Sequence, residues 1–471
     1  MTAVFAGSLS FRLEWPEMSL RTIGFLLLAL SILSTGPLRA QGYGPISPPE
    51  FYRQSLLNGM EILFLTRSDE RVPFLLMIKN GAAFDPIEKW GITYLTTLMI
   101  FEQRDDLREV EIQRGLQELN ADLNFGVEGD AIYFFGGTPR EHLVDTLNLL
   151  AEMVVRPVFN EEDFQQTRQR VILEIELEQQ HLGLVSQDLF LDELFQANPY
   201  AHSVKGTTES LNNLSLSDVR TQYRKLFMPN QAQLALYHSG DRNEIFRALS
   251  RHWGSWIRHN PLSFTFRQAR PPPRQRLKLL DWPSGESLFR WGSLGVERGS
   301  SDYYALKVFQ QYLTLCLPTW ATQVASENQI QASAELEAGR MPGFLQLNVQ
   351  APPHQLIAYY QKFEVLAKEL QEGHIDGQKF EEAKRLAYLE LTDSLDEPLS
   401  ALYQLLATGL HNVGINYLTN YGLRLERVTL ETFQNAVRKY VSPEHSVLVV
   451  AGPVQLLRSE LARIGKEEAP R

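Results

Sequence analysis

The stretch Lys-Trp-Gly-Ile-Thr-Tyr-Leu-Thr-Thr-Leu-Met-Ile-Phe at residues 89–101 decides the fold of this chain. The segment before it, Asn-Gly-Ala-Ala-Phe-Asp-Pro at residues 80–86, contains turn-forming residues and follows an apolar run at residues 72–79. This order predicts a strand, a loop and then the start of a helix.

These residues resemble the first catalytic helix of the pitrilysin/insulinase-type zinc peptidases, the family that includes mitochondrial processing peptidase. There the helix typically reads Gly-Leu-Ala-His-Phe-Leu-Glu-His-Met-Leu-Phe. Its two histidines bind zinc from one helix face, and its glutamate is the general base. Gly91 aligns with the glycine and residues 99–101 with the apolar end. Tyr94 and Leu98 then stand at the histidine positions, and Thr97 stands at the glutamate position.

The three replacements remove the chemistry that the motif supplies in the family. Leu98 has no lone pair for a metal, and the Thr97 hydroxyl cannot take a proton from metal-bound water near neutral pH. Tyr94 is a poor metal ligand without help, because a tyrosine has a pKa of about 10. We therefore expect these side chains to pack a helix, and we expect no catalytic residue, metal or cofactor in this chain.

The resemblance also implies where the third zinc ligand of the family would fall. The helical segment at residues 161–180 matches the family helix that carries this glutamate, and Glu174 lies at a common family spacing from Leu98. Glu176 and Glu178 leave that assignment open by a position or two. Because one carboxylate does not hold zinc against water, we interpret Glu174 as a residual or polar contact.

Two further segments resemble parts of the family pattern. Residues 198–207, Asn-Pro-Tyr-Ala-His-Ser-Val-Lys-Gly-Thr, match a run that closes over the first domain in the family. His202 within it has no partner at ligand spacing, so we interpret it as a loop residue. In the second half, Ala325 and Ala332 stand where the family often has an arginine and a tyrosine that bind substrate and stabilise the oxyanion.

The chain repeats itself at an offset of 214 residues. Residues 214–230 read Leu-Ser-Leu-Ser-Asp-Val-Arg-Thr-Gln-Tyr-Arg-Lys-Leu-Phe-Met-Pro-Asn, and residues 428–444 read Val-Thr-Leu-Glu-Thr-Phe-Gln-Asn-Ala-Val-Arg-Lys-Tyr-Val-Ser-Pro-Glu. Such self-similarity indicates two copies of one domain. With the resemblance, it predicts an α+β fold: two homologous domains, each an antiparallel-rich sheet with helices on one face, forming half of a processing-peptidase-like clamshell.

The N-terminus has the pattern of a secretory signal. Arg21 precedes an apolar run at residues 23–33, and Leu-Arg-Ala at residues 38–40 is an acceptable cleavage site. We expect export to the periplasm or cell envelope, with a start at Met18 as an alternative to Met1. An uncleaved membrane anchor is the other alternative, although the run is only about half the usual span.

These observations divide the 471 residues into six predicted segments. They are a signal peptide (1–40), a tether (41–50), an inactive N-terminal peptidase-like domain (51–259), a proline-rich linker (260–276), a C-terminal peptidase-like domain (277–464) and a polar tail (465–471). The net charge of −11 argues against nucleic acid as a partner. Cys316, the single cysteine, lies in an apolar context and is predicted to be a buried structural thiol.

Three functions remain open from the sequence. The leading hypothesis is a catalytically inactive homologue or subunit of a zinc metallopeptidase. It would complete a chamber for peptides or unfolded proteins as a heterodimer with an active partner, which alone would hold zinc. The second is a self-associating peptide-binding or envelope scaffold, for example a homodimer. The third is an active metallopeptidase whose site has been displaced.

Overall fold

The computed structural model describes residues 43–67, 69–102, 106–260, 266–282, 285–324 and 330–463. The predicted signal segment with Met18, the predicted polar tail and Ala325 lie outside these residues. Within the described ranges, no helix combines the length and the apolar character that crossing a membrane requires.

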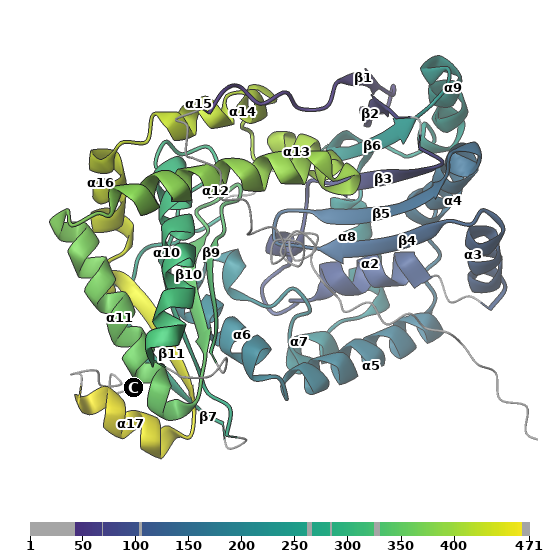
Figure 1. Ribbon diagram of the computed structural model, residues 1–471. Coiled ribbons are helices and arrows are strands. Elements are labelled where there is room, and N and C mark those ends of the chain that lie inside the picture. Colours follow the sequence, from purple (N-terminus) through teal and green to yellow (C-terminus); the bar gives the residue numbers. More distant parts are fainter. Residues whose placement is uncertain are drawn as a thin grey trace, which may run out of the picture. The chain divides into compact units, whose positions relative to one another are not determined.

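The first half of the chain builds a sheet with the order β1-β2-β6-β3-β5-β4 among the described residues (Figure 1). Its strands are β1 (Phe51–Ser55), β2 (Glu61–Thr66), β3 (Arg71–Ile78), β4 (Asp122–Val127), β5 (Ile132–Pro139) and β6 (Ala232–His238). β2 and β6 are parallel, and the other neighbours are antiparallel. β1 and β2 form an antiparallel hairpin through the Asn-Gly turn, where Gly59 has a φ of 90° that favours glycine.

The second half repeats this sheet without the first strand. Its order is β7-β11-β8-β10-β9, with β7 (Arg276–Asp281), β8 (Leu288–Leu294), β9 (Gln331–Leu336), β10 (Phe344–Gln350) and β11 (Ser446–Gly452). β7 and β11 are parallel and the other pairs antiparallel, which is the pattern of β2-β6-β3-β5-β4. The predicted α+β fold with two homologous domains is therefore confirmed.

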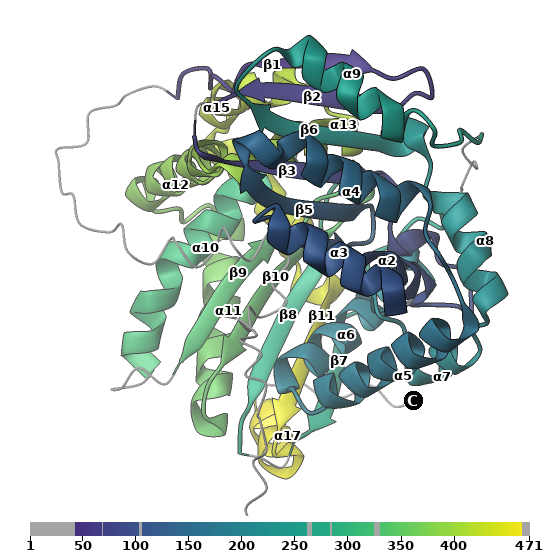
Figure 2. The ribbon, with the colours of Figure 1, turned by 90° about the vertical axis from the view of Figure 1, so that its right-hand side faces the viewer.

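The helices also follow the repeat. The first half has α2 (Ile92–Glu102), α3 (Asp106–Glu118), α4 (Leu143–Val155), α5 (Glu161–Glu178), α6 (Leu182–Phe195), α7 (Thr208–Asn212), α8 (Leu216–Leu226) and α9 (Arg242–Trp253). The second half has α10 (Tyr303–Val324), α11 (Pro353–Glu372), α12 (Gly377–Asp396), α13 (Pro398–Leu410), α14 (Asn416–Thr419), α15 (Tyr421–Glu426), α16 (Leu430–Tyr440) and α17 (Val454–Arg463). Figure 2 shows α3, α4 and α9 on one face of the first sheet.

Helices α8 and α16 show why the repeat is visible in the sequence. Each begins at a capping box, Ser215 with Asp218 in α8 and Thr429 with Thr432 in α16, which satisfies the free N–H groups of the first turn. Each is followed by a short 3-10 turn, η5 (Pro229–Gln231) or η6 (Pro443–His445), and then by a fully buried strand. The same local signals therefore give the same structure twice.

Each half also covers the sheet of the other half with one helix. Helix α6 contacts β8 and β11, whereas α13 contacts β3 and β6 (Figure 1). The fully buried Phe190 of α6 packs against Phe344 and over Gly292 of β8, where a Cβ atom would lie 2.4 Å from the Phe190 ring. The sequence predicted helices on one face of each sheet, and the structure adds this second layer.

The tether and the linker complete the path of the chain. Tyr43 and Ile46 of the predicted tether reach the second half: the Tyr43 hydroxyl donates to the carbonyl of Glu381 (3.1 Å), and the Ile46 N–H donates to the carbonyl of Thr419 (3.1 Å). The predicted linker ends one residue too late, because Arg276 already belongs to the β7 ladder with β11. The linker residues 261–265 lie outside the described part of the chain.

Candidate functional site

The loop that carries Lys205 is fixed against the start of α2. Gly91 and Gly206 have φ angles of 88° and 77°, and they face each other across this contact. A Cβ atom on Gly91 would lie 2.2 Å from the carbonyl oxygen of Lys205, and one on Gly206 would lie 2.2 Å from that of Trp90. Ser210 Oγ also donates to the Trp90 carbonyl (2.8 Å). Glycine at both positions therefore lets the two backbones meet.

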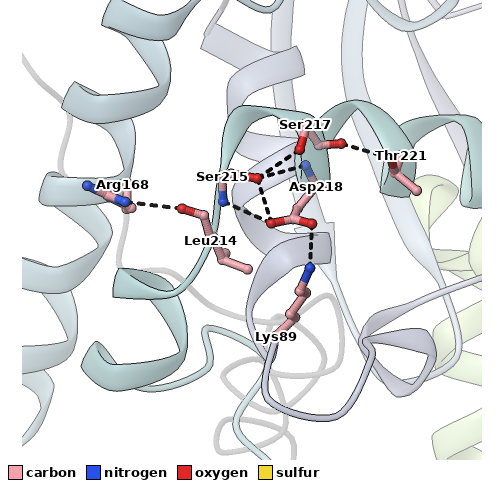
Figure 3. A network of polar contacts seen from close by, with 7 residues as sticks. All are labelled: Lys89, Arg168, Leu214, Ser215, Ser217, Asp218 and Thr221. Atoms are coloured by element: carbon pink, nitrogen blue, oxygen red, sulfur yellow. Dashed lines mark hydrogen bonds and ion pairs between the residues drawn. The ribbon is translucent and has the colours of Figure 1, made fainter.

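Helix α8 holds the start of α2 from another direction (Figure 3). Lys89, just before α2, pairs with Asp218 in the first turn of α8, and the Asp218 carboxylate accepts from the hydroxyl (2.7 Å) and N–H (3.0 Å) of Ser215. Burial opposes ionisation of Asp218, but the bonds from Lys89 and Ser215 outweigh it and lower the pKa below its usual value. Arg168 of α5 donates to the carbonyl of Leu214 (3.2 Å), which ties α5 to the same corner.

A carboxylate caps α2 itself. Asp85 accepts from the N–H groups of Gly91 (2.8 Å) and Thr93 (3.2 Å), from the Thr93 hydroxyl, and from Nε2 of Gln222 (3.3 Å). Burial raises the pKa of Asp85 to about 7, although the bonds from Thr93 and Gly91 and the charge of Lys225 act in the opposite direction. The start of α2 is thus held by a titratable group.

This carboxylate gives a pH-dependent stability. Because the pKa of Asp85 is raised from 3.8 to about 7, the native state keeps a proton that the unfolded state releases between these values. The contribution of Asp85 to the free energy of unfolding is therefore largest below pH 3.8 and falls as the pH rises to about 7. We expect Asp85→Asn to flatten the decrease in urea midpoint between about pH 4 and 7.

The matched control is Asp241→Asn, at the exposed N-cap of α9. This variant also removes a cap carboxylate, so it measures what the loss of such a cap costs where the carboxylate is exposed. An Asp85→Asn protein with an unchanged slope would show that Asp85 is ionised across this range in the native state.

The predicted motif residues all lie inside α2. Tyr94, Thr97 and Leu98 are buried, and Thr97 is inaccessible to solvent. Tyr94 and Leu98 belong to an apolar cluster that includes residues of α5. The Thr97 hydroxyl donates to the carbonyl of Thr93 (2.8 Å), one turn earlier in the same helix. The structure thus brings Tyr94 and Leu98 against α5 but directs the Thr97 hydroxyl to the helix backbone.

Glu174 is joined to Tyr94 through Lys205. The ammonium nitrogen of Lys205 lies 5.3 Å from the centre of the Tyr94 ring, 2.7 Å from Oε1 of Glu178 and 3.2 Å from Oε2 of Glu174. The Lys205 side chain is only 12% exposed. Arg170, also on α5, lies 3.9 Å from Glu174, so Glu174 is flanked by two cations.

Arg170 links this cluster to the end of α2. Its guanidinium forms a bidentate ion pair with the carboxylate of Glu102. This is the geometry in which an arginine and a carboxylate interact most strongly. Burial lowers the pKa of Arg170, but the bonds and charge of Glu102 outweigh it and raise the pKa. Helices α2 and α5 are therefore connected twice: directly through the Arg170–Glu102 ion pair, and indirectly through Lys205, which contacts α2 and α5.

The remaining predicted residues lie elsewhere. His202 stacks on Trp90 with ring centres 5.4 Å apart, and Ala332 lies in β9 opposite Val349 of β10. Cys316 is buried as predicted, and burial raises the pKa of its thiol to about 11. Across the described residues, no three His, Cys, Asp or Glu side chains are grouped as they would be to hold a metal ion.

Sequence reasoning missed Lys205, Arg170 and Glu102. Lys205 stands inside the segment at residues 198–207 that the sequence singled out, immediately before Gly206. A charged residue in that position was a usable signal, but its partners lie 27 and 31 residues away in the chain. Only the folded structure shows that they meet.

Comparison with known proteins supports this description. Residues 63–208 match the family model described as Insulinase (Peptidase family M16). An uncharacterised zinc protease of Streptomyces coelicolor is 21% identical over 33% of this chain and 34% of its own length. Cytochrome b-c1 complex subunit 1 of Caenorhabditis elegans is 21% identical over 42% of each chain, and a non-peptidase homolog of Helicobacter pylori is 19% identical over 34% and 37%. The chain therefore spans less than half the length of these curated relatives.

The solved structures agree in fold over most of the chain. A protease from Helicobacter pylori has a TM-score of 0.78 at 16% identity, over 86% of this chain and 100% of that chain. A peptidase M16 inactive domain from Pseudomonas fluorescens has a TM-score of 0.75 at 21% identity, over 86% and 98%. The chain thus shares the fold of these two proteins over 86% of its length. The first half of the chain is thus similar to the insulinase, or pitrilysin-type, peptidase family, whose model matches residues 63–208.

Proposed function

We propose that this chain is a catalytically inactive member of the family that completes a peptide-binding chamber with an active partner chain. The observation that carries the proposal is the group on α2: tyrosine, threonine and leucine stand at the motif positions 94, 97 and 98, beside the ammonium group of Lys205. The relatives of this chain include both proteins named zinc proteases and one named a non-peptidase homolog, and the proposal places it with the latter.

The residues at the motif positions do not fit a zinc ion. A catalytic zinc site takes three nitrogen, sulfur or oxygen ligands and leaves a fourth position for water. Leu98 offers none of these atoms, and the Thr97 hydroxyl is already bonded to the carbonyl of Thr93. Lys205 adds a positive charge beside Tyr94 and Glu174. No hydrolytic step can therefore be assigned to these residues.

A role in binding peptides is supported by the edge of the first sheet. β4 is the outermost strand beyond β5 in that sheet as the structure describes it. Its Phe125 packs on α2, with ring centres 5.9 Å from Tyr94 and 4.9 Å from Phe101. An extended peptide can add to such an edge through its main-chain hydrogen bonds. The active partner would supply the zinc and the general base.

The proposal includes export. The signal-like N-terminus favours the periplasm or cell envelope as the place where this chain and its partner meet. Cleavage after residue 40 would leave the segment that begins at residue 43 packed on the second half, through Tyr43 and Ile46. A mature N-terminus near residue 41, read by mass spectrometry of the purified chain, would support this part.

The experiment is a gentle affinity purification of the tagged chain from the envelope of its own cells, followed by mass spectrometry with quantification. We expect a stoichiometric partner of the same family that carries an intact His-x-x-Glu-His helix. We also expect peptide hydrolysis by the pair and none by this chain alone. Recovery of the chain as a homodimer, without a partner and without hydrolysis, would contradict the proposal and favour a scaffold.

A further inference from the structure

We propose that the ammonium group of Lys205 is a built-in replacement for a metal cation at the degenerate centre. It lies between Glu174, Glu178 and the ring of Tyr94, and it keeps a metal ion from that place. The inference rests on the part of the proposed function that places the degenerate motif on α2. It does not depend on whether a partner chain exists.

The two carboxylates need a cation. Glu174 and Glu178 stand one turn apart on α5, where like charges repel each other. Their side chains are only 30% and 33% exposed, so water screens this repulsion incompletely. The Lys205 ammonium contacts both, at 3.2 and 2.7 Å, and bridges them as a bound cation would. Together with Arg170, which lies 3.9 Å from Glu174, the ammonium balances the charge of these two acids.

The third side of the ammonium is the ring of Tyr94. Its centre lies 5.3 Å from the nitrogen, within the range at which a cation is attracted to an aromatic face. Tyr94 stands at a histidine position of the motif, and Glu174 stands at the position of the third ligand. The lysine therefore reaches the two positions that the resemblance assigns to metal binding on two different helices.

The lysine is held in this place by its backbone. The contact between Gly91 and Gly206 fixes the main chain on both sides of the peptide that links Lys205 to Gly206. The side chain is mostly buried, so its withdrawal would expose the carboxylates to each other. A dication arriving here would meet a positive charge in a partly buried site, where like charges repel more strongly than in water.

The test restores the motif with and without the lysine. The triple variant Tyr94→His/Thr97→Glu/Leu98→His is compared with the same variant carrying Lys205→Met. Zinc affinity is measured by competition with a chromogenic chelator, so no enzymatic activity is needed. We expect zinc to bind at least about tenfold more tightly once Lys205 is replaced. Lys368→Met in the triple variant is the matched control and should leave the affinity unchanged, because Lys368 is exposed on α11 and pairs with Glu372 there.

Two results would overturn the inference, and only the second would also count against the proposed function. Equal zinc affinity with and without Lys205 would show that the lysine does not exclude the metal, while the placement of the motif would stand. Absence of zinc in both variants, each shown to be folded by circular dichroism, would remove the placement itself. In that case the support for an inactive peptidase centre on α2 would fail too, whatever partner is found.

A second measurement covers the case in which the triple variant does not fold. In the wild-type background, Lys205→Met should lower the thermal midpoint by about 2–4 °C. The loss should shrink markedly when Glu174→Gln and Glu178→Gln are already present, since these changes remove the charges that the lysine balances. Strictly additive shifts in the midpoint would overturn the inference.

Discussion

Phe190→Ala is expected to lower the free energy of unfolding by about 3–5 kcal/mol. Phe190 has no exposed surface, and its ring fills the space over Gly292 between α6 and the second sheet. The cavity left by alanine cannot close easily, because Leu294, Val447 and Val449 belong to the same cluster on regular strands. Urea denaturation followed by tryptophan fluorescence measures the change.

The control for this prediction lies on the same helix. Leu184 is 48% exposed, so Leu184→Ala should change the free energy of unfolding by less than about 0.5–1 kcal/mol. If Phe190→Ala cost no more than Leu184→Ala, then α6 would not be anchored in the sheet of the other half. The packing of α6 on the second sheet would then contribute little to the stability of the protein.

Gly91→Ala is expected to cost about 3 kcal/mol or more. Two effects add: the φ of 88° is strained for alanine, and the new Cβ atom would lie 2.2 Å from the carbonyl oxygen of Lys205. Both groups at this contact are backbone, so relief requires the whole loop to move away from α2. Thermal denaturation gives the loss, and proteolysis of the native protein should reveal a cut near the loop.

Gly414→Ala separates the two effects. Gly414 has a φ of 71°, but no atom lies within 4 Å of the position where its Cβ would stand. Its replacement should therefore cost only the conformational strain of about 1–2 kcal/mol. Equal losses for the two variants would show that the contact between the loop and α2 yields without cost, and Lys205 would then not be held in place by its backbone.

Local sequence signals predicted a large part of the fold. The Asn-Gly pair at residues 58–59 is such a signal: it forms the turn between β1 and β2, where a residue with positive φ is required. The self-similarity at an offset of 214 residues predicted two copies of one domain, and α8 and α16 occupy equivalent places in the two halves. These features depend only on neighbours in the chain, which is why the sequence shows them.

The packing of α6 and α13 on the sheet of the opposite half could not be predicted from such local signals. The apolar residues of α6 include Phe190, Leu194 and Phe195, and this pattern says that a helix face is buried but not against which sheet. The choice of sheet depends on Gly292, because the absence of a side chain there leaves room on β8 for the Phe190 ring. Such a match between two distant small and large residues becomes visible only in three dimensions.

The candidate site was likewise predicted only in part. The degenerate positions Tyr94, Thr97 and Leu98 follow from the motif frame, and the structure places all three in the interior of α2. Their charged neighbours were not foreseen, because Lys205, Glu174 and Glu178 come from a loop and a helix whose approach is set by the contact of Gly91 with Gly206. The sequence therefore located the motif positions on one helix but gave no sign of the charged residues that lie beside them.

The central claim, an inactive centre closed by an internal cation, is tested most directly by the zinc content of the wild-type chain. The purified protein is equilibrated with a small excess of zinc, dialysed, and measured by plasma mass spectrometry together with hydrolysis of an unstructured peptide. We expect far less than one retained zinc per chain and no hydrolysis above the buffer rate. One tightly held zinc per chain with zinc-dependent hydrolysis would contradict it and establish an active peptidase with a displaced site.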